Sequence, residues 1–258
     1  MSVLLSHETI VGWLRETDTE RLGELWHAAD ECRRTNVGDE VHLRGLVEIS
    51  NHCIRLCGYC GLRAGGARLE RYRMTETEII ACAQQAASFG YGTVVLQSGE
   101  DYGLTAEWVA KVVTRIKRET GLAVTLSLGE RPPAELRLWR EAGADRYLLR
   151  FETSDPGLYA VIHPGRDGAP GHLHERVELL RCLREWGYEI GSGVMVGIPG
   201  QTVESLAADL ELFRALDLDM IGIGPFIPHP ATPLGSSDTT AHARTVVGDQ
   251  ASNDELTV

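Results

Sequence analysis

Three cysteines lie within eight positions of one another in the segment HCIRLCGYCGLR, at Cys53, Cys57 and Cys60. A structural zinc site needs four ligands, usually as paired CxxC elements, and no second CxxC occurs in the sequence. Three thiolates from one tight loop instead suit an iron–sulfur cube, with one iron per cysteine and a fourth iron open to another ligand. We therefore predict a [4Fe–4S] cluster here, with a zinc-stabilised domain and a chance group of structural thiols as the alternatives.

Short apolar runs alternate with helix-period segments from Val41 onward. Six strands are predicted, at residues 41–49, 92–99, 123–129, 146–152, 189–197 and 220–228. Five helices are predicted between them, at residues 74–90, 104–121, 132–143, 173–187 and 202–217. Continuous apolar strands with short connections indicate a parallel sheet buried on both faces. A doubly wound open sheet is the competitor, but no GxGxxG turn follows the first strand. We predict an α/β fold, a partial (β/α) TIM-type barrel with the cysteines at its active end.

The barrel pattern covers only part of the chain. Residues 1–40 read as two helices, near 7–17 and 20–36, and residues 41–234 as an incomplete barrel domain. Residues 235–258 have no aromatic side chain and are dense in Ser, Thr, Asp and Asn, which predicts a disordered tail. Six βα units are two short of a closed eightfold barrel, so we expect an open, curved sheet with an exposed edge.

Composition narrows the range of partners. The chain of 258 residues has 25 Lys and Arg against 37 Asp and Glu, a net charge of −12, which disfavours nucleic acid and anionic membranes. No run of eighteen apolar residues predicts a membrane span, and no basic, apolar start predicts a signal peptide. The remaining cysteines, Cys32, Cys82 and Cys182, are expected to be buried thiols, and we expect a reducing cytoplasm.

The Cx3Cx2C spacing, with Tyr59 directly before Cys60, resembles the radical S-adenosylmethionine (SAM) enzymes. In that superfamily SAM chelates the open iron, and its reductive cleavage releases a 5′-deoxyadenosyl radical. Four further stretches resemble superfamily elements in the expected order: LQSGED (96–101), LLRFET (148–153), VMVGIPGQT (194–202) and GIGPFIPHPATPL (222–234). Each is weak alone, but each falls at a strand end on the cysteine side, and together they indicate this superfamily.

Within the superfamily, the amino-acid sequences of several segments resemble the HydE family of [FeFe]-hydrogenase maturases. These segments include CGYCGLR (57–63), RYRMTETEI (71–79), VTLSLGE (124–130) and GADRYLLRFETSDPGLY (143–159). The resemblance implies a maturase acting on a small organometallic or amino-acid-derived substrate, with other maturases and an electron donor as partners. An enzyme of the methylornithine or biotin synthase type is an alternative. The family's last two strands are absent, so we expect a truncated or divergent member, or one completed by a partner. A non-catalytic scaffold that binds the cluster and SAM is therefore a second alternative.

Under this resemblance the three cysteines hold the cluster. Contacts to SAM are expected from Tyr59, Gln97, Glu100, Ser127, Glu152, Arg176 and Met195. Arg176 would form an ionic fork with the SAM carboxylate, and a solvated arginine on its helix is the alternative.

Three further residues, Thr125, Arg150 and Arg44, are candidates for the substrate chamber. Thr125 and Ser127 alternate with Leu126, so both project to one face of the third strand. Arg150 stands two positions before Glu152, shares its face and can orient it. Arg44 would be a buried guanidinium that pairs with an anionic substrate if it faces the barrel interior, or an outward partner of a helix carboxylate if it does not.

Overall fold

The computed structural model describes residues 5–66, 69–165 and 168–235. Six strands form one sheet in chain order, and every neighbouring pair is parallel. They are β1 (Arg44–Ser50), β2 (Thr93–Ser98), β3 (Ala123–Ser127), β4 (Arg146–Leu148), β5 (Glu189–Val196) and β6 (Met220–Pro225). The prediction of a partial (β/α) barrel is confirmed.

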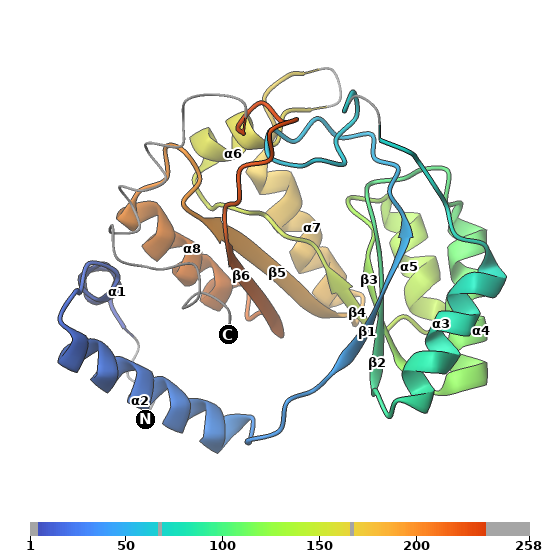
Figure 1. The fold of residues 1–258 in the computed structure, drawn as a ribbon, viewed down its shortest axis with the longest axis horizontal. Coiled ribbons are helices and arrows are strands. Elements are labelled where there is room, and N and C mark those ends of the chain that lie inside the picture. The colour runs from blue at the N-terminus through green and yellow to red at the C-terminus, as the bar shows by residue number, and fades with distance from the viewer. Residues whose placement is uncertain (1–4, 67–68, 166–167, 236–258) are drawn as a thin grey trace.

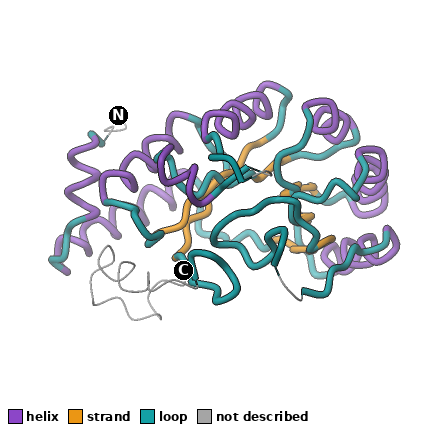
Figure 2. The backbone as a smooth tube through the Cα atoms, turned by 90° about the horizontal axis from the view of Figure 1, so that it is seen from above, coloured by secondary structure: helices purple, strands orange, loops and turns teal. Residues whose placement is uncertain are grey.

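The predicted helices follow the outer side of the curved sheet (Figure 1), and the view from above shows them as an arc around the strands (Figure 2). They are α3 (Glu76–Ser88), α4 (Ala106–Thr120), α5 (Pro133–Glu141), α7 (Leu173–Glu185) and α8 (Val203–Ala215). Local signals fix their ends: Thr75 and Glu78 form a capping box at the start of α3. Gly121 closes α4 with a left-handed φ of 68°.

Strand alternation separates two faces of the sheet. Val94, Leu96 and Val124 are fully buried on the face that packs against the helices. The parallel register pairs Val95 with Thr125 and Gln97 with Ser127, so these side chains share the opposite, inner face. The outer face thus supplies the apolar core, and the inner face holds most of the predicted ligand-binding residues of the strands.

The sheet is open, as the count of βα units predicted. In the described part of the chain it ends at β1 on one side and β6 on the other. Ile221 and Ile223 of β6 are 54% and 55% exposed on the outer face. At the N-terminal ends of these edge strands, Nη1 of Arg44 lies 3.4 Å from Sδ of Met220. The two edges therefore approach each other at the end of the barrel away from the cysteines.

Two helices precede the sheet, α1 (His7–Leu14) and α2 (Thr19–Asn36). Helix α1 lies against α8, where Nδ1 of His7 is 3.0 Å from Oε2 of Glu211. Helix α2 buries no residue, and Trp26 is 60% exposed. No helix in the described part of the chain combines the length and apolarity that a membrane crossing requires.

Several sequence predictions need correction or lie outside the described residues. Strand β4 ends at Leu148, four residues before the predicted limit, so Arg150 and Glu152 follow the strand. A seven-residue helix, α6 (Pro156–Ile162), was not predicted; Asp155 caps it and Pro156 opens it. Cys32, expected to be buried, is exposed. The predicted tail, apart from Gly235, lies outside the described residues.

Candidate active site

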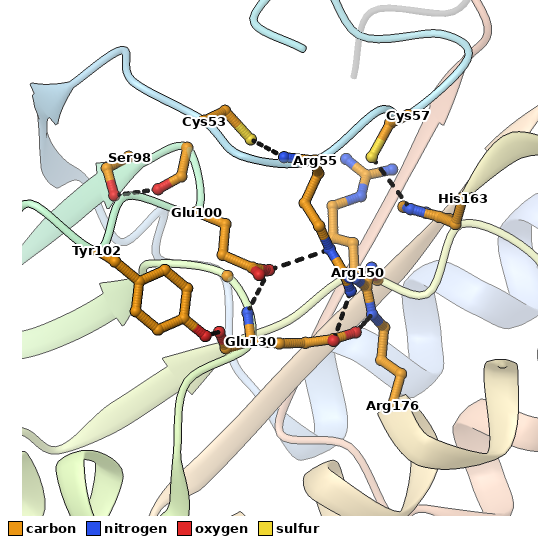
Figure 3. Close-up of polar contacts among 12 residues, drawn as sticks. Cys53, Arg55, Cys57, Ser98, Glu100, Tyr102, Glu130, Arg150, His163 and Arg176 are labelled. Atoms are coloured by element: carbon orange, nitrogen blue, oxygen red, sulfur yellow. Dashed lines mark hydrogen bonds and ion pairs between the residues drawn. The ribbon is translucent and has the colours of Figure 1, made fainter. Parts of the chain in front are cut away.

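The cysteine loop follows β1 and lies over the C-terminal ends of the strands (Figure 3). Its three cysteines are half-buried free thiols. Backbone hydrogen bonds tie the loop to distant elements: the amide of Ile54 donates to the carbonyl of Glu100 at 3.1 Å, and that of Gly58 to Ile162 at 2.8 Å. The loop is therefore fixed between the end of β2 and the end of α6.

Two arginines that were not among the predicted site residues hydrogen-bond to backbone carbonyls of the loop. Arg63 donates from Nε to the carbonyl of Cys57 and from Nη2 to that of Leu56, each at 3.1 Å. Arg71 donates to the carbonyls of Leu62 and Arg63, at 2.9 and 3.1 Å. Because these guanidinium groups satisfy loop carbonyls, they help to hold the backbone of the cysteine loop in place.

Gly99, in the predicted glycine–glutamate element, lets the end of β2 approach the loop closely. A Cβ at this position would lie 2.3 Å from the carbonyl oxygen of His52 and 2.7 Å from Cβ of Cys53. A residue larger than glycine would displace the first cysteine. The sequence element and the cysteine loop are thus in direct contact.

A network of charged side chains lies beneath the loop (Figure 3). Arg55, between the first two cysteines, places Nε 3.2 Å from Oε2 of Glu100 and hydrogen-bonds Glu130 through Nη2. Arg176, on α7, donates from Nε to Oε1 of Glu130 at 2.7 Å and from Nη1 to the carbonyl of Arg150 at 2.7 Å. Arg55 and Glu130 were not among the predicted site residues, and the network joins them to Glu100 and Arg176, which were.

Burial and the neighbouring arginines shift the pKa values of the carboxyl groups in this network in opposite directions. Burial opposes ionisation of Glu130, but Arg176 and Arg55 outweigh it and hold the pKa of Glu130 below its ordinary value. For Glu100 burial prevails, and its pKa is raised despite Arg55. Arg176 itself is buried, which rules out a solvated arginine on its helix. Its proposed contact to a carboxylate ligand stays a prediction.

Glu152 sits in a strained backbone position just after β4. Its φ is +65°, a left-handed conformation that costs about 1–3 kcal/mol in a residue other than glycine. Backbone hydrogen bonds to β5 hold it there, from its amide to the carbonyl of Gly193 at 2.9 Å and from the amide of Met195 to its carbonyl at 3.2 Å. The sheet therefore fixes the backbone position from which the Glu152 side chain projects.

The carboxylate of Glu152 is only partly compensated. Nε of Arg150 lies 3.1 Å from Oε1, but without hydrogen-bond alignment, and Oε2 is buried without a partner. Burial raises the pKa of Glu152 to about 7, although Arg150 and Arg176 oppose the shift. A buried, unpartnered oxygen of this kind is a place where a hydroxyl of a ligand can donate a hydrogen bond.

The other predicted residues divide into two groups. Below the charged network on the inner face, Thr125 is buried with Oγ1 unpartnered, and Gln97 and Ser127 are half-buried neighbours. Met195 and Tyr59 pack against a small apolar cluster around Ile198.

Arg44 is not part of this arrangement. It is exposed and lies at the N-terminal end of β1, the opposite end from the cysteines. It is not the buried guanidinium that an anionic substrate would pair with. Among the described residues it contacts Sδ of Met220 and not a helix carboxylate. Its distance from the cysteine loop gives no support to a role in the substrate chamber.

His163, directly after α6, is a site residue that the sequence did not reveal. Its Nδ1 lies 3.3 Å from Sγ of Cys57, and its Nε2 lies 3.2 Å from the hydroxyl of Tyr59. The ring is buried, and burial together with Arg176 and Arg55 places its pKa well below the ordinary value. The Asp155–Pro156 cap was a sequence signal for the start of a short helix, but it does not indicate that the residue after this helix lies beside the cysteine loop.

The donor set fits a cluster better than a single ion. In the described ranges, no group of three or more His, Cys, Asp or Glu side chains is arranged to hold one metal ion, which does not favour a zinc site. A cube takes one cysteine per iron and needs no such convergence. Burial raises the pKa of Cys57 to about 12, so its thiolate requires a compensating metal charge. The three loop thiols and the unpartnered Glu152 oxygen fit a [4Fe–4S] cluster with SAM beside it.

The structure combines an open parallel barrel with a three-cysteine loop, which lies over buried charged side chains at the strand ends. This combination is typical of radical SAM folds. The family model described as the Radical SAM superfamily matches residues 47–213, and the chain belongs to this superfamily. It is 50% identical over 212 residues to the [FeFe] hydrogenase maturase subunit HydE of Thermotoga maritima, covering 82% of this chain and 59% of that protein. The resemblance predicted from the sequence is confirmed.

Two methylornithine synthases are more distant relatives. The chain is 28% identical to the 3-methylornithine synthase of Methanosarcina acetivorans, over 89% of this chain and 64% of that protein. The crystal structure of methylornithine synthase (PylB) aligns with a TM-score of 0.84 at 26% identity, over 95% of this chain and 73% of that one. The chain thus spans about three fifths of the length of the curated relatives it matches.

Proposed function

We propose that this chain is a radical SAM enzyme of [FeFe]-hydrogenase maturation. Cys53, Cys57 and Cys60 would hold a [4Fe–4S] cluster, and SAM would bind beside it. The observation that carries the proposal is the loop itself: three free, half-buried cysteines held by protein contacts over a layer of buried charges. The 50% identity to the HydE maturase supports the choice of hydrogenase maturation over methylornithine synthesis, for which the identity is 28%.

When bound, the cluster would supply one electron for the reductive cleavage of SAM to methionine and a 5′-deoxyadenosyl radical. The protein's own contribution is to bind and orient the cofactor. Oε2 of Glu152, buried without a partner, is suited to accept a hydrogen bond from a ribose hydroxyl. The other residues proposed to contact SAM are Tyr59, Gln97, Glu100, Ser127, Arg176 and Met195.

The substrate would occupy the inner face of the sheet beneath SAM. Thr125 offers a buried hydroxyl without a partner, and Arg150 offers a guanidinium beside Glu152. These groups suit a small organometallic or amino-acid-derived substrate with anionic or hydrogen-bonding parts. The domain that carries the site would be residues 41–234, with 1–40 as a peripheral helical segment and other maturases and an electron donor as partners.

Anaerobic reconstitution with iron and sulfide tests the cluster directly. The wild-type protein should bind iron and sulfide in equal amounts and gain a broad visible absorption. Cys57→Ala should lose both, because the remaining two thiols cannot hold the cube in this loop. Cys182→Ala is the matched control, since this half-buried free cysteine lies on α7 away from the loop. Full iron binding and SAM cleavage by Cys57→Ala would contradict the assignment.

A binding scaffold without turnover is the second candidate. It is favoured by the open sheet, whose edges β1 and β6 have no further strand partner within the described residues. An open barrel admits water to a site whose radical chemistry depends on its exclusion. Incubation with dithionite and SAM separates the two candidates. An enzyme accumulates 5′-deoxyadenosine, whereas a scaffold binds SAM and forms no 5′-deoxyadenosine.

A further inference from the structure

We infer that His163 donates a hydrogen bond from Nδ1 to the thiolate of Cys57, and that this bond raises the reduction potential of the cluster. The inference rests on the proposed cluster. Its basis is the contact between Nδ1 of His163 and Sγ of Cys57, 3.3 Å apart, from a residue 106 positions along the chain. His163 would act through Cys57 and is therefore a positioning residue.

The direction of the hydrogen bond follows from the chemistry of the partners. A cysteine that binds iron has lost its proton, so Sγ of Cys57 can only accept. The proton between the two atoms must then be on Nδ1 of His163. Nε2 of the neutral ring is an acceptor, and the hydroxyl of Tyr59, 3.2 Å away, donates to it. The result is a chain of donors from Tyr59 through His163 to Cys57, in which each bond polarises the next.

The imidazole is held in this orientation on every side. Its ring stacks on Tyr159, with centroids 4.7 Å apart and planes 27° apart, and meets the edge of Tyr59 at 5.3 Å. The amide of His163 donates to the carbonyl of Tyr159 at 2.8 Å, and the side chain and backbone together are 5% exposed. A ring this confined keeps Nδ1 aimed at the sulfur.

The donor to Cys57 differs in kind from the donor to its neighbour. Sγ of Cys53 accepts from the amide of Arg55, a backbone group of the same loop, at 3.5 Å. The donor to Cys57 is a side chain on another element, so it can be replaced without changing the backbone of the loop. A hydrogen bond to a thiolate sulfur withdraws negative charge from it, which stabilises the reduced cluster and raises its potential.

Spectroelectrochemical titration of the reconstituted cluster, without SAM, measures this effect. His163→Phe keeps a ring against Tyr159 but has no donor. We expect its midpoint potential to become more negative by about 59 mV, which is a tenfold change in the ratio of reduced to oxidised cluster for a one-electron couple. Iron and sulfide are measured on the same samples, so that loss of the cluster is not mistaken for a change of potential.

Two polar variants separate the donor from the ring. The amide nitrogen of His163→Asn reaches the place of Nδ1 and should restore a potential near that of the wild type. The longer side chain of His163→Gln places its nitrogen near Nε2, away from Cys57, and should behave as His163→Phe. The comparison of His163→Asn with His163→Gln tests the role of the donor even if His163→Phe takes up no cluster. His174→Asn, an exposed histidine on α7, is the matched control and should change nothing.

The outcomes are distinct. A fully loaded His163→Phe or His163→Gln protein with the wild-type potential overturns the inference and leaves the proposed function standing. Equal shifts in His163→Asn and His163→Gln also overturn it, because the donor position would then be irrelevant. A wild-type protein that takes up no iron overturns the inference together with the proposed function.

Discussion

The ion pairs at the two ends of the parallel sheet differ in their exposure to solvent. At the N-terminal end, Arg146 pairs with Glu189, and the two side chains are 22% and 52% exposed. At the C-terminal end, Arg176 pairs with Glu130, and the Arg176 side chain is only 6% exposed. A pair in contact with water costs little to maintain, whereas a buried charge must be compensated by the protein itself.

The C-terminal end of the sheet carries features that lower the stability of the fold. The C-terminal end also holds Glu152 in a strained backbone conformation, and one of its carboxylate oxygens is buried without a partner. None of these features strengthens the apo fold, because strain and unsatisfied polar atoms both cost free energy. They gather beside the cysteine loop, which is the pattern of an end built to receive ligands.

Removing the buried cation should have the largest effect. Arg176→Met leaves Glu130 with Arg55 alone and removes a donor from the carbonyl of Arg150. We expect the free energy of unfolding to fall by about 3 kcal/mol or more, as for other buried pairs that lose one partner. Urea denaturation at neutral pH measures it.

The matched change at the other end is Arg146→Met, which breaks a pair of similar chemistry in contact with water. We expect a loss of about 0–1 kcal/mol. Equal losses for Arg146→Met and Arg176→Met would mean that burial does not change how much an ion pair contributes to stability at the two ends.

Neutralising Glu152 should raise the free energy of unfolding, in contrast to the loss of Arg176. Its pKa is raised from 4.5 to about 7 by burial, so folding is disfavoured wherever the carboxylate is ionised in the unfolded chain. This cost is absent below pH 4.5, grows as the pH rises, and is complete above pH 7, where it amounts to about 3 kcal/mol. Glu152→Gln should therefore match the wild type near pH 4 and be more stable by up to about 3 kcal/mol at pH 8.

The measurement is the free energy of unfolding in urea at a series of pH values, without SAM. Arg150, left without its carboxylate, is partly exposed and can be hydrated. A constant difference between Glu152→Gln and the wild type from pH 4 to pH 8 would show that the carboxylate does not titrate as a buried group. The same variant should bind SAM less tightly, if Glu152 contacts the ribose as proposed.

Most of the fold could be predicted from the sequence, because it depends on local patterns. Continuous apolar runs placed all six strands, and the predicted helices at 74–90 and 104–121 agree with the ends of α3 and α4 to within two residues. Helix α6 was missed because seven residues are too few to show a helical period. The end of β4 was misplaced because Phe151 is buried like a strand residue, although Glu152 has left the extended conformation.

The site could be predicted only in part. The cysteines stand out by their spacing, and residues at strand ends share one edge of the sheet. Arg55, Glu130 and His163 acquire their roles through contacts 75 to 106 positions apart along the chain, and no local pattern marks such pairs. The predicted role of Arg44 gains no support, because an alternating strand pattern tells which face a side chain is on, and not at which end of the barrel it will be solvated.

Two glycines at the opposite ends of β2 give the finest test of the difference between the ends. Gly99→Ala would place Cβ 2.3 Å from the carbonyl oxygen of His52 and 2.7 Å from Cβ of Cys53, whereas a Cβ at Gly92 would meet nothing within 4 Å. We expect Gly99→Ala to cost about 1–3 kcal/mol by overpacking and to lower iron incorporation, because the first cysteine must move. Gly92→Ala should be neutral or stabilising by less than about 1 kcal/mol, with full iron incorporation. Normal stability and iron content in Gly99→Ala would show that the loop is not held against β2, because a loop free to shift accommodates the methyl group.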